Sequence, residues 1–97
     1  MNQSTEARLA TLGITLPAAA TPRSARIRMA RKIGNLLYVS GQLPSWEGEL
    51  RHVGTVGQTM TLEEGQQAAR LSALNVLAQA RAVLPNGLDD IVSVVNL

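Results

Sequence analysis

The run Ser40-Gly41-Gln42 contains the residues best suited to do chemistry in this chain. It follows a short apolar segment, residues 36–39, which is preceded by the turn-forming pair Gly34-Asn35. A strand that stops at a polar residue and a glycine exposes backbone N–H groups and one hydroxyl at the edge of a sheet, where a small ligand can be held. Ser40, Gly41 and Gln42 are therefore candidate ligand-binding residues. The alternative is a simple turn in which Ser40 satisfies a local backbone group.

The other reactive side chains form no recognisable catalytic or metal-binding pattern. His52 is the only histidine, and Asp89 or Asp90 could complete a triad with Ser40 only on paper, because no Gly-x-Ser-x-Gly motif surrounds the serine. One histidine and no cysteine also argue against a tightly bound transition metal. We therefore assign no catalytic residue and expect no metal.

Five of the nine basic residues lie within ten positions: Arg23, Arg26, Arg28, Arg31 and Lys32. Such a cluster can bind the phosphates of a nucleic acid. The alternative is a solvated strand face, because Arg26, Arg28 and Lys32 share one parity and Ile27, Met29 and Ile33 share the other. Aromatic side chains that would stack on bases are absent from this stretch, which favours the solvated face.

The composition indicates one small domain of 97 residues with a thin core. Phenylalanine is absent and aromatic residues make up 2% of the chain, so Leu, Val, Ile and Ala must build the core. Small chains with thin cores often gain stability by association. The lack of cysteine suits a reducing compartment, and we find no leader and no apolar run of membrane-spanning length. We expect a soluble, cytoplasmic protein that does not enter a membrane.

The first half of the chain predicts a short helix followed by a hairpin. Residues 1–22 are expected to form a helix, capped by Ser4 and stopped by Gly13, and then a linker. A first strand is predicted over residues 25–32, a turn at 33–35 and a second strand over 36–40. Residues 44–48 should be a loop, residues 49–53 a possible third strand and residues 54–58 irregular chain.

The second half predicts a long helix between two strands. Thr61 and Glu64 have the spacing of a capping box, so Glu63 and Glu64 are better explained by capping than by acid–base chemistry. Apolar residues then recur at helical spacing as far as Leu84, with Gln79 largely off that face, and Pro85-Asn86-Gly87 ends the helix. A strand is expected from residue 90 or 91 to 97. The fold class is α+β: a hairpin followed by a strand–helix–strand crossover.

The chain ends inside this apolar segment, at Val94-Val95-Asn96-Leu97. Natural chain ends are more often polar and exposed. We therefore expect a chain truncated at its C-terminus, with 1–97 forming a partial domain.

Several sequence pieces resemble the RidA/YjgF family, also called L-PSP endoribonuclease-like, in its longer-chain branch. The opening piece is the Gly-Asn turn, the apolar strand and Ser-Gly-Gln with a following proline. Three more pieces follow the order of that branch: residues 8–13, residues 54–65 and residues 88–92. Residues 68–70 and 74–77 also have sequences typical of that branch. Any one of these matches is weak evidence for the family, but together they occur in the family's order over nearly the whole chain, which is strong evidence.

The resemblance implies a chorismate-mutase-like α+β fold that assembles as a homotrimer with small-molecule clefts between subunits. Typical members hydrolyse the enamine and imine intermediates released by pyridoxal-phosphate enzymes, giving a keto acid and ammonia, and they need no metal or cofactor. Some relatives were described as ribonucleases.

The family's site residues can be placed on this sequence only in part. Ser40 matches the serine that lines the cleft, Gly41 matches the residue whose N–H faces the ligand, and Gln42 continues the motif. Ile27 stands where the family has a first-strand tyrosine. A late arginine, which clamps the substrate carboxylate, and a late glutamate, which positions water, would lie beyond Leu97.

Three functions follow as hypotheses. The first is a RidA-like enamine/imine deaminase, which acts as a hydrolase on C–N bonds, and this is the family-level assignment. The second is a non-catalytic trimeric module that binds small carboxylates, which Ile27 favours. The third is an RNA-associated protein of the L-PSP type that uses the basic stretch.

Overall fold

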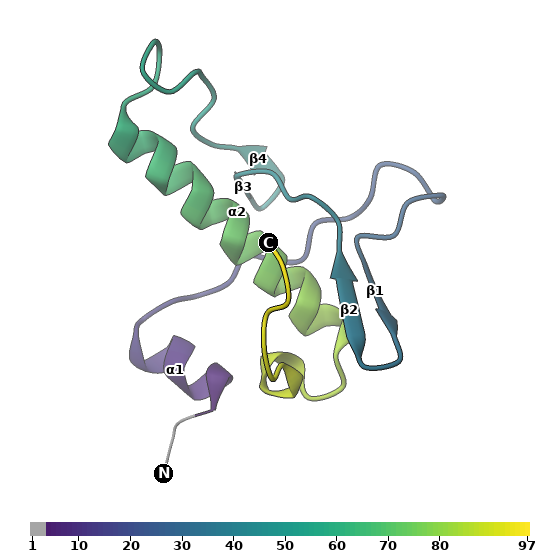
Figure 1. Ribbon diagram of the computed structural model, residues 1–97. Coiled ribbons are helices and arrows are strands. Elements are labelled where there is room, and N and C mark those ends of the chain that lie inside the picture. The colour runs from purple at the N-terminus through teal and green to yellow at the C-terminus, as the bar shows by residue number, and fades with distance from the viewer. Residues whose placement is uncertain (1–3) are drawn as a thin grey trace.

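The long helix α2, Leu62–Val83, is the element against which most of the other elements pack (Figure 1). The computed structural model describes residues 4–97. Helix α2 contacts the strands β1, β2 and β3 and the short 3-10 helix η1, and η1 in turn contacts α1. The remaining elements, in chain order, are α1 Thr5–Thr11, β1 Ala30–Ile33, β2 Leu36–Val39, β3 Ser45–Trp46, β4 Glu49–Leu50 and η1 Gly87–Asp90.

Both helices begin and end where the sequence predicts. In α2, the Thr61 hydroxyl accepts from the Glu64 N–H at 3.1 Å, and the Glu64 carboxylate accepts from the Thr61 N–H at 3.3 Å, which completes the capping box. The Ser4 hydroxyl caps α1, and Gly13 follows that helix with a φ of +69°. Within residues 4–97, no helix is both long and apolar enough to cross a membrane. The part of the first segment that precedes Ser4 lies outside the described residues.

The β1–β2 hairpin turns at Gly34-Asn35, with Ile33 paired to Leu36 and Ala30 paired to Val39. Gly34 has a φ of +59°, which a glycine adopts without strain in this kind of tight turn. The first strand is shorter than the predicted 25–32. The Ser24 hydroxyl accepts from the Arg26 N–H and the Ser24 carbonyl accepts from the Ile27 N–H, so a local turn replaces the ladder there.

A second small hairpin was not predicted. Residues 44–48 were expected to be a loop and 49–53 a strand, but β3 pairs with β4 across the turn Glu47-Gly48. Both turn residues have positive φ, +51° and +85°. The strand stops at Leu50 because His52 also adopts a positive φ, +55°, which breaks the extended run.

The strand expected from residue 90 or 91 to 97 does not form, so that prediction is wrong for these residues. Helix η1 turns the chain after α2, and residues 92–97 make no backbone hydrogen bond to any other described segment. Val92 is 98% exposed. A strand exists only where a neighbouring edge pairs with it, and no edge among residues 4–97 does so.

The core lies where α1, α2 and η1 meet. It is aliphatic throughout, and Leu88 of η1 is fully buried at its centre. Leu37 of β2 packs against it from the hairpin, together with Ile14, Leu71, Leu77 and Ile91. This packing places one face of the β1–β2 hairpin on α2 and holds the end of β2 beside the helix (Figure 1).

Candidate functional site

The end of β2 is tied to the chain that precedes β1. The Ser40 N–H donates to the Met29 carbonyl at 2.8 Å, and the Ser40 hydroxyl donates to the Arg28 carbonyl at 2.9 Å. Gln42 folds back, so that its Nε2 donates to the Ser40 carbonyl at 3.0 Å. The hydroxyl is therefore held in one orientation, with its lone pairs left to accept from a ligand.

Gly41 is the residue of this run whose backbone is most accessible to a ligand. Its N–H donates to no group among residues 4–97, and a Cβ built on it would meet nothing within 4 Å. An unobstructed backbone N–H beside an oriented hydroxyl could bind a carboxylate or carbonyl oxygen. Ser40, Gly41 and Gln42 thus lie together as the sequence predicts, and their ligand-binding role stays a prediction.

A shallow cavity of about 360 Å³ is lined in part by Arg28, whose carbonyl accepts from the Ser40 hydroxyl. It is lined by residues 19–22 and 27–30, together with Gln79 and Val83 of α2. Ile27 and Arg28 therefore form part of a cavity wall, and the Ser40 hydroxyl is bonded to that wall. Ser40, Gly41 and Gln42 do not themselves line this cavity.

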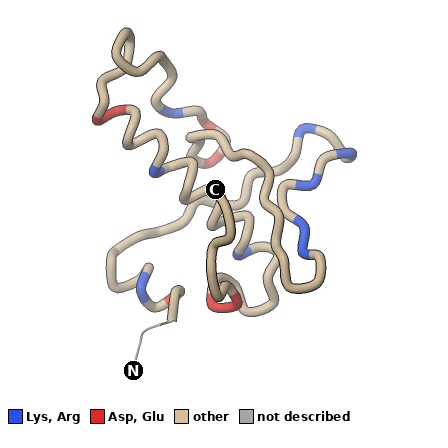
Figure 2. The backbone as a smooth tube through the Cα atoms, in the orientation of Figure 1, with Lys and Arg blue, Asp and Glu red and all other residues tan. Residues whose placement is uncertain are grey.

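The basic stretch is exposed but does not form one strand face. Figure 2 shows its residues spread over the loop that leads to β1 and along β1 itself. Arg26 and Arg28 precede the strand, and Arg31 and Lys32 are neighbours within it and so point to opposite faces. The predicted parity pattern is wrong because the strand begins five residues later than expected.

Two polar residues of α2 were not recognised as structural. Asn75 and Gln79 are 2% and 4% exposed. The Asn75 amide donates to the carbonyls of Ser45 and Leu43 at 2.7 and 3.1 Å, and the Gln79 amide donates to the Ala20 carbonyl at 2.8 Å. Gln79 is therefore on the buried side of the helix, contrary to the prediction. The periodicity of apolar residues indicates which side of a helix is buried, but it does not identify polar residues that are buried on that side.

Glu6 forms a second cluster that the sequence did not reveal. Its carboxylate accepts from Arg81 Nη2 at 2.7 Å and from the Leu88 N–H at 2.9 Å, which joins α1 to α2 and η1. The hydrogen bond from Arg81, and then the one from Leu88, lowers the pKa of Glu6 below its ordinary value. This cluster stabilises the fold rather than forming a site.

Comparisons with known proteins place the chain in a structural family. No family model matches it. It is 43% identical over 91 residues to protein TCP17 of Trypanosoma cruzi, covering 94% of this chain and 56% of that protein. The structure of a candidate endoribonuclease from Shewanella oneidensis MR-1 matches with a TM-score of 0.79 and 32% identity, over 89% of this chain and 56% of that one. The chain is a RidA/YjgF-like protein.

A second solved structure supports the same assignment. It is Atu1372 of Agrobacterium tumefaciens, a protein of unknown function, with a TM-score of 0.70 and 42% identity over 87% of this chain and 48% of that one. The RidA/YjgF-like chain thus spans about half the length of the proteins that it matches. The α+β fold class and the family resemblance are confirmed.

The RidA/YjgF-like chain does not assemble the hypothetical triad. Asp89 accepts from the Glu6 N–H at 2.9 Å, and Asp90 accepts from the N–H and the side-chain amide of Asn86 at 2.9 and 3.0 Å. These bonds from Asn86 lower the pKa of Asp90. No hydrogen bond joins His52 to either carboxylate within the described chain. Among residues 4–97, no group of three His, Cys, Asp or Glu side chains could hold a metal ion.

Proposed function

We propose that this chain supplies the strand-exit part of a small-molecule site in a cytoplasmic, homotrimeric RidA-like deaminase. The reaction is the hydrolysis of an enamine or imine, in which water adds to the C=N carbon, the C–N bond breaks, and a keto acid and ammonia leave. The observation that supports it is the Ser40 hydroxyl, held by the Arg28 carbonyl, beside a Gly41 N–H that has no acceptor among residues 4–97, in a chain that matches the Shewanella structure with a TM-score of 0.79.

Each residue of the run has a binding role in this proposal. The Gly41 N–H donates to an oxygen of the substrate, and the lone pairs of the Ser40 hydroxyl accept from its nitrogen. The Gln42 amide donates to the Ser40 carbonyl and so fixes the backbone conformation of residues 40–42, which follow β2. The carboxylate clamp and the water-positioning carboxylate that the family resemblance implies match no position in residues 1–97. Within this sequence we therefore assign binding and orientation, and no catalytic residue.

The direct test measures keto acid and ammonia formation from an enamine released in situ by a pyridoxal-phosphate-dependent amino-acid deaminating enzyme. The proposal expects both products to appear faster with the chain present than by spontaneous hydrolysis alone. An unchanged rate would remove the deaminase function for this chain.

The non-catalytic binding module is the second candidate, and Ile27 favours it. This residue lines the same cavity as Arg28, whose carbonyl accepts from the Ser40 hydroxyl, and it presents an aliphatic side chain where the family has a tyrosine hydroxyl. Without that hydroxyl, the cavity has one hydrogen-bond donor fewer with which to polarise a bound substrate. Binding of pyruvate without acceleration of enamine hydrolysis would support this function over the first.

An RNA-associated function rests on the five exposed basic residues between Arg23 and Lys32. The matched Shewanella protein is itself described as a candidate endoribonuclease. RNA binding that weakens steeply as salt is added would support this function, and no binding at low salt would remove it.

A further inference from the structure

Asn75 and Gln79 lie one turn apart on α2, and each uses its amide NH₂ group to hold a crossing segment of chain. The amide oxygens behave differently. Within residues 4–97 no donor binds either oxygen. No fully occluded side-chain oxygen or nitrogen in the described chain lacks a partner, so each amide oxygen must keep some accessible surface.

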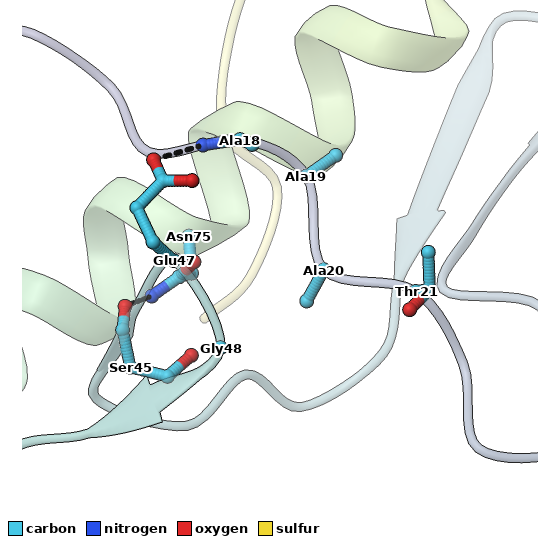
Figure 3. Close-up of a pocket in the computed structure, with 8 residues that line it drawn as sticks. All are labelled: Ala18, Ala19, Ala20, Thr21, Ser45, Glu47, Gly48 and Asn75. Carbon is cyan, nitrogen blue, oxygen red and sulfur yellow. Dashed lines mark hydrogen bonds between the residues drawn. The ribbon is translucent and has the colours of Figure 1, made fainter.

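Asn75 lines a second cavity, which shares residues 19–21 with the one beside Arg28. It has a volume of about 260 Å³ and lies between the 18–21 segment and the turn of the β3–β4 hairpin (Figure 3). Its walls are formed by Ala18, Ala19, Ala20, Thr21, Ser45, Glu47, Gly48 and Asn75. Neither Ser40, Gly41 nor Gln42 lines it.

Of the described residues that line this cavity, only Glu47 is charged. Figure 3 shows its carboxylate beside Ala18, whose N–H donates to Glu47 Oε1 at 3.4 Å. That bond is long, and the other carboxylate oxygen binds no donor among the described residues. Among the described residues, the cavity walls therefore include a carboxylate and an asparagine whose amide oxygen has no donor, and no cationic side chain.

The backbone at Glu47 adds a separate argument. Its φ of +51° places a glutamate at a turn position that favours asparagine, aspartate or glycine. Turn formation alone does not explain a long acidic side chain there. A residue held in a sparsely populated conformation beside a cavity is a reason to look for a ligand.

We propose that this cavity binds a small molecule that carries a primary ammonium group on a short alkyl chain. Three N–H donors of the ammonium match the acceptors, namely the Glu47 carboxylate and the Asn75 amide oxygen, and the alanine methyl groups of residues 18–20 contact the alkyl part. The site is independent of the proposed deaminase function because it shares no residue with the Ser40 exit.

The test is a titration of the isotope-labelled chain with n-butylammonium chloride, followed by the backbone amide NMR signals. The proposal expects saturable shifts at residues 18–21 and Gly48 with a millimolar dissociation constant, and much smaller shifts with n-butanol, a neutral probe of the same length. Glu47→Gln should raise the dissociation constant about tenfold.

Glu49→Gln is the matched control, since it removes the same charge two residues away. The Glu49 side chain is 76% exposed, does not line the cavity and has only a 3.9 Å contact with Arg51. Butylammonium binding should survive this change. Ala19→Leu, which fills the cavity, should weaken binding even if Glu47→Gln perturbs the turn. Equal binding of butanol, equal loss in both glutamate variants, or no saturable shift at residues 18–21 would overturn the proposal.

Discussion

Glu6 shows how one half-buried carboxylate can order several segments of a small protein. It accepts from Arg81 and from the Leu88 N–H, while its own N–H donates to Asp89. Gly87 is also constrained here, because a Cβ on it would lie 2.6 Å from Glu6 Oε2 and its φ is +63°. The fully buried Leu88 follows directly. The position of η1 on the core therefore depends on a residue 82 positions away.

Stability should fall in acid because of two carboxylates, Glu6 and the Asn86-bonded Asp90. The pKa of Glu6 and that of Asp90 are lowered from ordinary values of 4.5 and 3.8. A lowered folded-state pKa contributes stability that is present above the unfolded value and is lost as pH falls through the folded one. We expect the thermal midpoint, followed by circular dichroism, to drop as pH falls from about 6 to about 3. Glu6→Gln should flatten this dependence, and an unchanged pH profile in that variant would contradict the assignment.

Ser40 is predicted to bind ligand as well as the Arg28 carbonyl. Ser40→Ala removes the oriented hydroxyl while leaving the Gly41 N–H in place, so it should weaken roughly fivefold the binding of oxamate, a pyruvate analogue whose NH₂ group can donate to that hydroxyl. Isothermal titration calorimetry measures this directly. Ser93→Ala, in the exposed 92–97 segment, is the control and should bind normally. Equal affinities for wild type and Ser40→Ala would leave Ser40 with a local structural role only.

At the scale of elements, the bounds of α2 depend on its own sequence, whereas the β3–β4 hairpin depends on a residue far away in the chain. The capping box at Thr61 and Glu64 needs residues only three positions apart, so it forms as predicted. The β1–β2 turn is equally local. The β3–β4 hairpin is different, because Asn75 holds the carbonyls of Leu43 and Ser45 from a distance of about thirty residues along the chain.

The cap of α2 makes a prediction at this scale. Thr61→Ala should lower the free energy of unfolding by about 1 kcal/mol. The Glu64 N–H loses the hydroxyl to which it donates, and the Glu64 carboxylate is then held less firmly against the residue-61 N–H. Chemical denaturation followed by helix ellipticity measures the change. Thr61→Ser keeps the hydroxyl and should be nearly as stable as the wild type. A Thr61→Ala variant with unchanged stability would show that the capping box contributes nothing.

At the scale of the whole molecule, the β1–β2 hairpin buries one face on α2 and leaves the other open. Leu37 faces the core, and therefore Ile33, Leu36 and Tyr38, which alternate with it in the paired register, face outward. They are 56%, 49% and 58% exposed. This strip, which also carries Arg31 opposite Tyr38, is a largely apolar surface on which the proposed trimer could assemble.

The trimer proposal can be tested on this face. We expect light scattering after size-exclusion chromatography to give three times the mass of the chain, and Leu36→Lys to give a monomer because it places a charge in the contact. Leu12→Lys is the control, since Leu12 is 69% exposed near α1 and away from the hairpin. A wild-type monomer would contradict the trimer, and equal effects of both substitutions would remove the hairpin from the interface.

Much of the fold follows from local sequence signals. The Ser4 and Thr61 caps, the Gly34-Asn35 turn and the stop at Pro85 each act within a few residues, and all were predicted correctly. The grouping of Ser40, Gly41 and Gln42 at one strand exit was also predictable, since the three are neighbours in sequence.

The features that sequence reasoning missed depend on contacts between distant residues. The roles of Asn75, Gln79 and Glu6 are set by partners 30, 59 and 82 positions away. Residues 91–97 have the composition of a strand, yet they stay unpaired because a strand needs an adjacent edge as well as suitable residues. The sequence by itself therefore determined the helices, the first turn and the candidate exit. The tertiary structure decided which polar groups are buried, where the cavities lie and which extended segments become strands, because burial and pairing depend on what lies opposite.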